Sequence, residues 1–176
     1  MAYNIEQYLL DRANIHDTVT KLTICYDTQD IPTLIKDVFA DEVDVDYTSI
    51  LGGSPFRVGG SEWSERLGKI ISAYDSTQHI TTGLVINLPQ PSGGTKQQRP
   101  DIVTVDAQAM ATMVKASAAT DAAGSILQNG GLLNIELERN QTLEEKGVNP
   151  WRITKYVVIK KWTMGNQGVN NTALSK

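Results

Sequence analysis

Hydrophobic residues recur at helical spacing near the start of the chain. Ile15, Val19, Leu22 and Tyr26 follow one another at intervals of four, three and four residues, so they share one face of a helix with 3.6 residues per turn. This spacing predicts a helix over residues 5–29.

Further on, the pattern changes from one helix to shorter elements. Asp30, with Pro32 two positions later, is typical of a new helix start and predicts a short helix that ends near Val38. From 42 to 47 apolar residues alternate with acidic ones, which predicts a strand with one wet face. Apolar residues return to helical spacing at 62–74, which predicts another helix.

The second half of the chain reads as consecutive long strands. They are expected at 78–88, 101–117 (with a possible break near Asp106), 127–139 and 151–162. Helices first and strands later favour an α+β fold, with the helices on one face of a curved, mostly antiparallel sheet. The polar Pro/Gly segment 89–100 is either a mobile flap or a plain surface insertion. Residues 1–164 are expected to form a single domain, and the aperiodic tail 165–176 is expected to be frayed.

Composition excludes several classes of function. The chain of 176 residues has a net charge of −4 and no lysine or arginine cluster, so nucleic acid is not an expected partner. A single cysteine, Cys25, excludes a disulfide framework, and two histidines, His16 and His79, argue against a histidine-rich metal centre. Apolar runs fall far short of the ~20 residues that cross a bilayer, and the first residues do not resemble a secretory signal. No membrane association and a cytoplasmic location are therefore expected.

The small inventory of acid–base groups directs attention to His79 and Asp27. His79 lies in STQHITTG near the start of a predicted strand, where a histidine serves either as hydrogen-bonded structure or as a catalyst. Asp27 follows Tyr26 at the margin of the apolar stripe, so its carboxylate either reaches solvent or points into a cavity. His16 cannot contact Asp27 directly, because eleven helical residues rise by ~16 Å.

A resemblance to a known family bears on these alternatives. The runs CYDTQD, DVFADEVDVDYTS, STQHITTG and PWRITKYVVIKKW, in this order, resemble the SnoaL-like family. Within it they are most similar to scytalone dehydratase and related fungal enzymes of secondary metabolism. The resemblance spans Ile15 to Trp162. It implies a cone-shaped α+β barrel around a deep apolar pocket, and a homo-oligomer, either a dimer or a trimer.

The resemblance also implies roles for five residues. Asp27 would orient His79, which would remove a proton alpha to a carbonyl group. Tyr26 and Tyr47 would hold a water that polarises the carbonyl oxygen, and Asn134 would hydrogen-bond the substrate. These groups need no metal and no cofactor, because tyrosine hydroxyls and an amide can stabilise an enolate oxygen in a dry site.

One departure from the family pattern limits the reaction. The dehydratases carry a second histidine in the middle strand, at a position that aligns with Thr112 or Met113 here. Without that general acid, proton abstraction followed by isomerisation or ring closure is favoured, and dehydration is left open for an easy leaving group.

Two functional hypotheses follow. The first is a cofactor-independent isomerase, cyclase or dehydratase that acts on a polyketide- or terpenoid-derived small molecule in secondary-metabolite biosynthesis. The second is a non-catalytic small-molecule-binding or interaction module on the same fold, because one fold hosts many functions.

Overall fold

A six-stranded curved sheet forms one side of the molecule in the computed structural model, which describes residues 3–91, 97–116 and 123–170. Its strand order is β2-β1-β6-β5-β4-β3. All neighbouring strands are antiparallel except β1 and β6, which are parallel. The strands are β1 (Phe39–Asp46), β2 (Phe56–Gly59), β3 (Ser76–Ile86), β4 (Ile102–Val114), β5 (Ile126–Arg139) and β6 (Trp151–Gly165).

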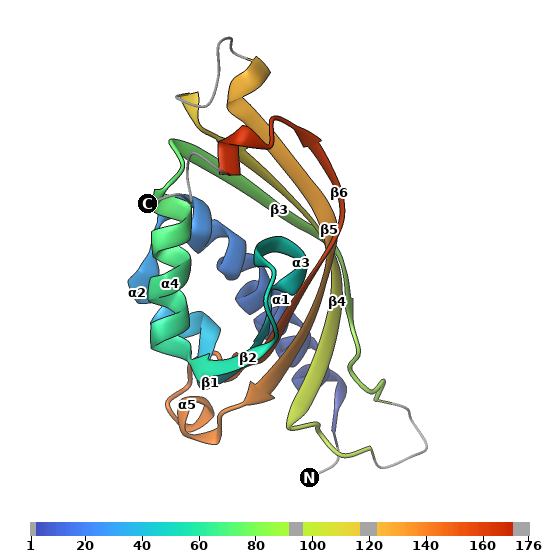
Figure 1. The fold of residues 1–176 in the computed structure, drawn as a ribbon. Helices are drawn as coiled ribbons and strands as arrows, with labels where there is room; N and C mark the ends of the chain where they lie inside the picture. The colour runs from blue at the N-terminus through green and yellow to red at the C-terminus, as the bar shows by residue number, and fades with distance from the viewer. Residues whose placement is uncertain (1–2, 92–96, 117–122, 171–176) are drawn as a thin grey trace.

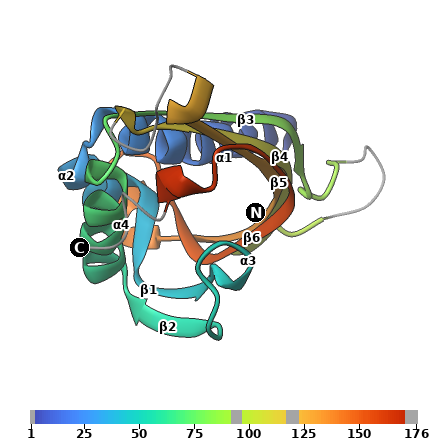
Figure 2. The ribbon, with the colours of Figure 1, turned by 45° about the horizontal axis from the view of Figure 1, so that its top comes forward.

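The long helices α1 and α4 cover the concave side of the sheet, and Figure 2 shows the sheet curving partly around the space that they face. The helical segments are α1 (Ile5–Thr28), α2 (Ile31–Thr33), the π-helical turn η1 (Leu34–Val38), α3 (Thr48–Leu51), α4 (Gly60–Ser72), the 3₁₀ turn η3 (Ala123–Ser125) and α5 (Gln141–Glu145). The expected α+β cone with a curved, mostly antiparallel sheet and N-terminal helices is confirmed.

Helix α1 is defined by local sequence at both ends. The Asn4 side chain accepts a hydrogen bond from the backbone of Gln7, whose own side chain accepts one from the backbone of Asn4, which is a capping box. Gln29 ends the helix in the left-handed conformation, with φ at 54°. The stripe from Ile15 to Tyr26 is buried, so burial of this apolar face fixes the helix on the sheet.

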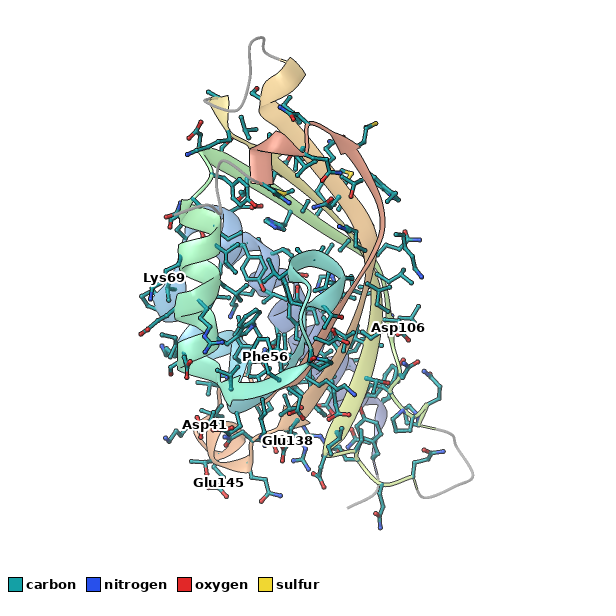
Figure 3. The ribbon with its side chains drawn as sticks, in the orientation of Figure 1. Asp41, Phe56, Lys69, Asp106, Glu138 and Glu145 are labelled. Carbon is teal, nitrogen blue, oxygen red and sulfur yellow. The ribbon has the colours of Figure 1, made fainter. Side chains whose placement is uncertain are left out.

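Strand alternation decides which side chains face the helices. On β4 and β5 the odd-numbered residues are turned inward, and they include buried Val103, Val105, Leu133 and Ile135. Strand β4 runs through Asp106 without a break. Figure 3 shows Asp106 on the side of the sheet turned away from the helices.

Three short elements differ from the sequence-based expectations. β2, α3 and α5 were not expected, and β1 ends at Asp46 rather than at Tyr47. The chain turns there because the carboxylate of Asp46 accepts hydrogen bonds from the backbone and the hydroxyl of Thr48. Tyr47 therefore lies in the connection between β1 and α3.

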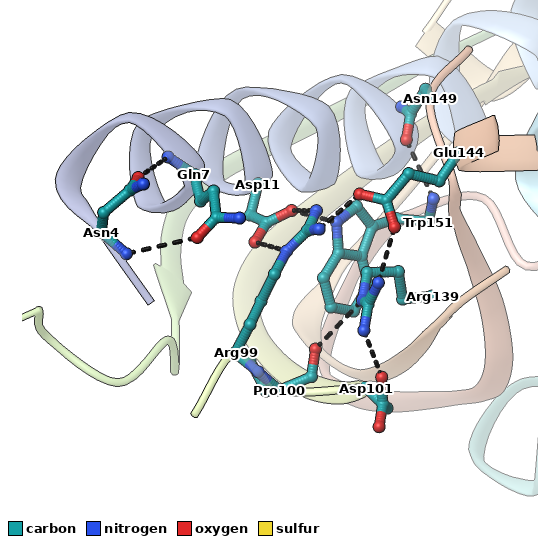
Figure 4. A network of polar contacts seen from close by, with 10 residues as sticks. All are labelled: Asn4, Gln7, Asp11, Arg99, Pro100, Asp101, Arg139, Glu144, Asn149 and Trp151. Carbon is teal, nitrogen blue, oxygen red and sulfur yellow. Dashed lines mark hydrogen bonds and ion pairs between the residues drawn. The ribbon is translucent and has the colours of Figure 1, made fainter. Parts of the chain in front are cut away.

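A network of charged side chains ties the segment before β4 to α1 and α5 (Figure 4). The fully buried Asp11 accepts two hydrogen bonds from the guanidinium of Arg99, at 2.9 and 2.7 Å, and one from the indole of Trp151 at 3.0 Å. Arg99 also pairs with Glu144, which is bound in turn by Arg139 at 2.6 Å. The end of the 89–100 segment is thus anchored, whereas residues 92–96 lie outside the described part of the chain.

The tail departs from its expected frayed state over its first residues. β6 extends to Gly165, and Val169 is fully buried against Met113 and Leu127. The Tyr74 hydroxyl donates to the side-chain oxygen of Asn170 at 2.8 Å. A small apolar anchor and one hydrogen bond therefore hold residues 166–170, and the remaining expectation, on 171–176, lies outside the described residues. No helix in the described ranges is long and apolar enough to cross a membrane.

Candidate active site

A largely apolar cavity lies between the concave face of the sheet and helices α3 and α4. The cavity and the open solvent at its mouth together comprise about 900 Å³ of space free of protein atoms. Aliphatic and methionine side chains form much of its wall, and small residues form part of its floor. These are Ile50, Leu51, Leu67, Ile70, Ile71, Met113, Val158, Ala109, Ala111 and Gly131.

Asp27 and His79 meet at this cavity. Asp27 lies in the last turn of α1 and His79 lies on β3, and the two elements pack against each other. One carboxylate oxygen of Asp27 is 2.7 Å from Nδ1 of His79, and the other accepts the backbone N–H of His79 at 2.6 Å. The hydroxyl of Thr77 donates to the first oxygen at 2.8 Å. The carboxylate therefore holds both the ring and the backbone of His79.

These hydrogen bonds also set the charge on Asp27. Burial of the carboxyl group raises its pKa, but the bonds from His79 and Thr77 outweigh that effect and leave the pKa below its usual value. Asp27 is thus an anion beside the imidazole. Because a carboxylate only accepts hydrogen bonds, we expect a neutral His79 ring to carry its proton on Nδ1. Nε2 is then the basic nitrogen left for the cavity that His79 lines.

One tyrosine contacts this dyad, and two more line the cavity. The ring of Tyr26 packs edge-on against that of His79, with centroids 5.3 Å apart, and Tyr47 and Tyr156 are 5.7 Å apart and line the cavity. Burial raises the pKa of all three phenols, so they remain protonated and able to donate hydrogen bonds. The hydroxyl of Tyr26 is buried and has no geometrically acceptable hydrogen-bond partner in the described part of the chain.

The structure thus brings together four of the five site residues expected from the sequence, Tyr26, Asp27, Tyr47 and His79, whose catalytic roles stay predictions. It does not bring Asn134 to them. As an even-numbered residue of β5, Asn134 is turned away from the cavity, and its amide donates to Asp106 at 2.5 Å. The placement follows from the two-residue period of a strand, which separates neighbouring positions onto opposite faces.

A different asparagine lines the cavity. Asn129, an odd-numbered residue of the same strand, accepts the hydroxyl of Thr163 at 2.8 Å through its side-chain oxygen. This bond leaves the amide NH₂ of Asn129 as a donor. The alternation that includes Leu133 and Ile135 was a signal in the sequence that could have selected Asn129 instead of Asn134. Tyr156 was missed in the same way, although it alternates with Val157 on the last strand.

The middle strand places small or apolar residues beside the dyad. Ala111 is opposite His79 in the register of β3 and β4, and Met113 lines the cavity, while Thr112 lies on the other face and is bound by Gln128. Of the described residues that line the cavity, the ionisable ones are His79, Lys160, Tyr47, Tyr74 and Tyr156. No group of three or more His, Cys, Asp or Glu side chains in the described ranges could hold a metal ion.

Comparison with known families places the chain. The model of the SnoaL-like domain matches residues 7–157. The chain belongs to the SnoaL-like family. This match confirms the family that the sequence runs around Asp27, Tyr47 and His79 suggested. In a separate comparison, no curated protein matches the chain.

Solved structures share this fold across nearly the whole SnoaL-like chain. The Kfla4162 protein from Kribbella flavida superposes with a TM-score of 0.74 at 21% identity, over 93% of this chain and 97% of its own. A hexachlorocyclohexane dehydrochlorinase (LinA type 2) gives 0.66 at 18%, over 92% of each chain. A provisionally assigned scytalone dehydratase from Novosphingobium aromaticivorans gives 0.67 at 12%, over 93% of each. At sequence identities this low, the structural comparison shows that the folds are alike and nothing more.

Proposed function

We propose that this SnoaL-like protein is a cofactor-independent enzyme in which His79 removes a proton from a carbon next to a carbonyl group. The observation that carries the proposal is the 2.7 Å contact between Asp27 and Nδ1 of His79 at the wall of an apolar cavity. A carboxylate on one ring nitrogen raises the basicity of the other and fixes which nitrogen faces the substrate.

The remaining polar groups of the cavity suit the product of that step. Proton removal turns the ketone into an enolate, whose negative charge gathers on oxygen. The phenols of Tyr47 and Tyr156 and the amide of Asn129 are neutral donors that line the same cavity. Donors fixed in a largely apolar site stabilise such an oxygen because they need not reorganise and compete with little water.

The fate of the enolate distinguishes isomerisation, ring closure and elimination. Return of the proton from His79 to another carbon gives isomerisation, and attack of the enolate carbon on a second carbonyl gives ring closure. Elimination requires a leaving group that departs without a strong acid, because Ala111 and Met113 occupy the middle-strand positions near the dyad. The dehydrochlorinase among the structural neighbours, named for loss of hydrogen chloride, supports this third outcome as compatible with the fold.

For the substrate, we propose a polyketide- or terpenoid-derived intermediate of secondary-metabolite biosynthesis. The apolar wall supports a mostly hydrocarbon body, because burial of apolar surface supplies most of the binding free energy in such cavities. The donors near His79 support at least one carbonyl oxygen at the reacting end.

The direct test is exchange of carbon-bound hydrogen in D₂O. The purified protein would be incubated with a panel of bicyclic aryl ketones that carry acidic α-hydrogens, and deuterium incorporation would be followed by mass spectrometry. We expect exchange above the buffer rate, a loss of at least about 100-fold in His79→Gln and Asp27→Asn, and no loss in His16→Gln. His16 is the matched control because its side chain is exposed on α1.

The opposite result would favour the binding module. If the protein binds such ketones, as seen by quenching of tryptophan fluorescence, but exchanges none of them faster than buffer, the proposed proton abstraction is wrong.

A further inference from the structure

We propose that Lys160 selects substrates that carry an anionic group, most simply a carboxylate, at the end of the molecule away from the reacting carbon. The inference rests on the proposed function only in treating the ligand of this cavity as a substrate. Lys160 contributes to the lining of the cavity, and it is the one lysine, arginine, aspartate or glutamate that does so among the described residues.

The position of Lys160 is set by strand alternation. Tyr156, Val158 and Lys160 are alternate residues of β6, with no register shift between them, and all three line the cavity. Opposite Lys160 on β5 is Gly131, which has no side chain to block the space between them. The side chain therefore extends from the cavity wall toward solvent, where the residue is exposed.

A hydroxyl group holds the backbone at this point. The pairing of β1 with β6 ends at Val157, and the Ser49 hydroxyl of α3 continues it by donating to the carbonyl of Val158 at 2.5 Å. The hydroxyl oxygen of Ser49 in turn accepts the backbone N–H of Lys160 at 3.0 Å. These bonds fix the backbone position from which the flexible Lys160 side chain extends.

The charge of Lys160 has no counterpart in the described structure. In the described ranges Lys21 and Lys115 pair with Asp37 and Asp75, whereas the ammonium of Lys160, like those of most other described lysines, makes no hydrogen bond or ion pair. Lys160 differs from the other unpaired lysines because it lines the cavity. No carboxylate lines the cavity, although the chain as a whole carries a charge of −4. An anionic ligand would supply the missing partner, and a cationic one would meet repulsion with no compensating carboxylate.

The register gives the approximate length of the ligand. Thr81 lies opposite Ala109, Ala109 opposite Gly131, and Gly131 opposite Lys160, so three strand spacings of ~4.8 Å, about 14 Å along the sheet, separate β3 from Lys160. His79 is two residues from Thr81 on β3. A substrate that reaches both ends would lie over the small residues between them, with its carbonyl near His79 and its carboxylate near Lys160.

The test compares a charged and a neutral ligand of the same shape. Dissociation constants for 2-naphthoate and 2-naphthamide would be measured by titration calorimetry at pH 7 and low salt, in wild type, Lys160→Met and Lys161→Met. Lys161 is the matched control because it is the neighbouring exposed lysine and does not line the cavity. We expect wild type and Lys161→Met to prefer the naphthoate about fivefold, and Lys160→Met to lose this preference while keeping its affinity for the amide.

Added salt should reduce the preference in wild type, because the ammonium is exposed and screened. Equal affinities for the two ligands in wild type, including no measurable binding of either, would overturn the proposal. A preference that survives in Lys160→Met would do the same. The readout involves no turnover, so it is separate from the deuterium-exchange test, and repeating it in Asp27→Asn separates ligand selection from catalysis.

Discussion

Asp27 makes three contacts with β3, and their arrangement explains why a carboxylate is required there. One oxygen receives Thr77 and the ring of His79, and the other receives the backbone N–H of His79. An asparagine has only one acceptor oxygen, so its NH₂ group must replace one of the two carboxylate oxygens. In the first case the NH₂ group faces the backbone N–H of His79, which is also a donor. In the second case it faces Nδ1 of the His79 ring and the Thr77 hydroxyl. In the second case the imidazole proton moves to Nε2, and the ring can no longer accept a proton from a substrate in the cavity.

Asn129 is expected to contribute to substrate binding, and Asn134 is not. Replacing Asn129 by Ala removes an amide donor from the cavity, and we expect the catalytic efficiency for a reactive ketone to fall about 10- to 100-fold. Asn134→Ala removes only the contact with Asp106 on the outer face and should change efficiency less than twofold. Steady-state kinetics of the two variants would decide between them, and a larger loss in Asn134→Ala would contradict the assignment.

The lowered pKa of Asp27 makes a stability prediction. Because the carboxyl group is more acidic when folded, its contribution to the free energy of unfolding is complete above its usual pKa of 3.8 and is lost as pH falls through the lower, folded-state value. We therefore expect wild type to exceed Asp27→Asn in stability near neutral pH, and the difference to close below about pH 3.8. Urea unfolding from pH 7 to pH 2 would measure it. A difference that stays constant to pH 2 would show that the carboxylate is not held as described.

At the scale of single residues, the sequence predicts which residues carry acid–base chemistry more easily than it predicts which way each side chain faces. His79 and Asp27 were found because acid–base groups are scarce in the chain and because their runs resemble a family. Asn129 and Tyr156 were missed because the choice between neighbouring strand residues depends on register, which one slip inverts. Thr77 was missed because its role is to bind Asp27, fifty residues away in sequence.

Among the elements, the packing of α1 on β3 is what creates the site, since Asp27 and His79 come from these two. The other end of α1 is held by buried charge, with Asp11 fully enclosed by Arg99 and Trp151 (Figure 4). Removing one partner of a buried ion pair destabilises a protein by more than the intact pair stabilises it, because the remaining charge is left buried and unpaired.

We expect Asp11→Ala to lower the free energy of unfolding by about 3–5 kcal/mol, with Arg99 left buried and without its main partner. Asp17→Ala is the matched control, because Asp17 is an exposed aspartate of the same helix, and it should change the free energy by less than about 0.5 kcal/mol. Chemical denaturation measures both. A loss below about 1 kcal/mol in Asp11→Ala would show that the network does not carry the stability assigned to it.

The long elements were predictable and the short ones were not. Amphipathic stripes several turns long and strands of eleven to fifteen residues carry enough periodic positions to be recognised, as in α1, α4 and β3 to β6. By contrast, β2, α3 and α5 have four or five residues each, and local contacts such as the cap by Asn140 decide them. The segregation of helices before strands was sufficient for the fold class, because it leaves few ways to cover one sheet face.

Considered as a whole, the molecule has two sheet faces with different roles. The concave face carries the cavity. Strand alternation turns the side chains of Ile80, Met110 and Trp162 to the opposite face, where they lie in register across β3, β4 and β6 with Gly130 of β5 beneath the Trp162 ring, although Ile80, Met110 and Gly130 also contribute to the lining of the cavity. Ile80 is 43% exposed and Trp162 is 45% exposed. An exposed apolar row of this kind is typical of association surfaces.

We expect sedimentation velocity to give the mass of a dimer or trimer, and a monomer at tens of micromolar would contradict the homo-oligomer that the family resemblance implies.

The most direct test of the central claim is the tautomer of His79, read from the ¹⁵N shifts of the imidazole ring by NMR. With only His16 and His79 in the chain, a His16→Gln variant assigns both rings. We expect neutral His79 to carry its proton on Nδ1 in wild type and to shift toward the Nε2-protonated form in Asp27→Asn, while His16 is unchanged. Identical His79 spectra in wild type and Asp27→Asn would mean that the carboxylate does not orient the imidazole, and the proposed mechanism would fail.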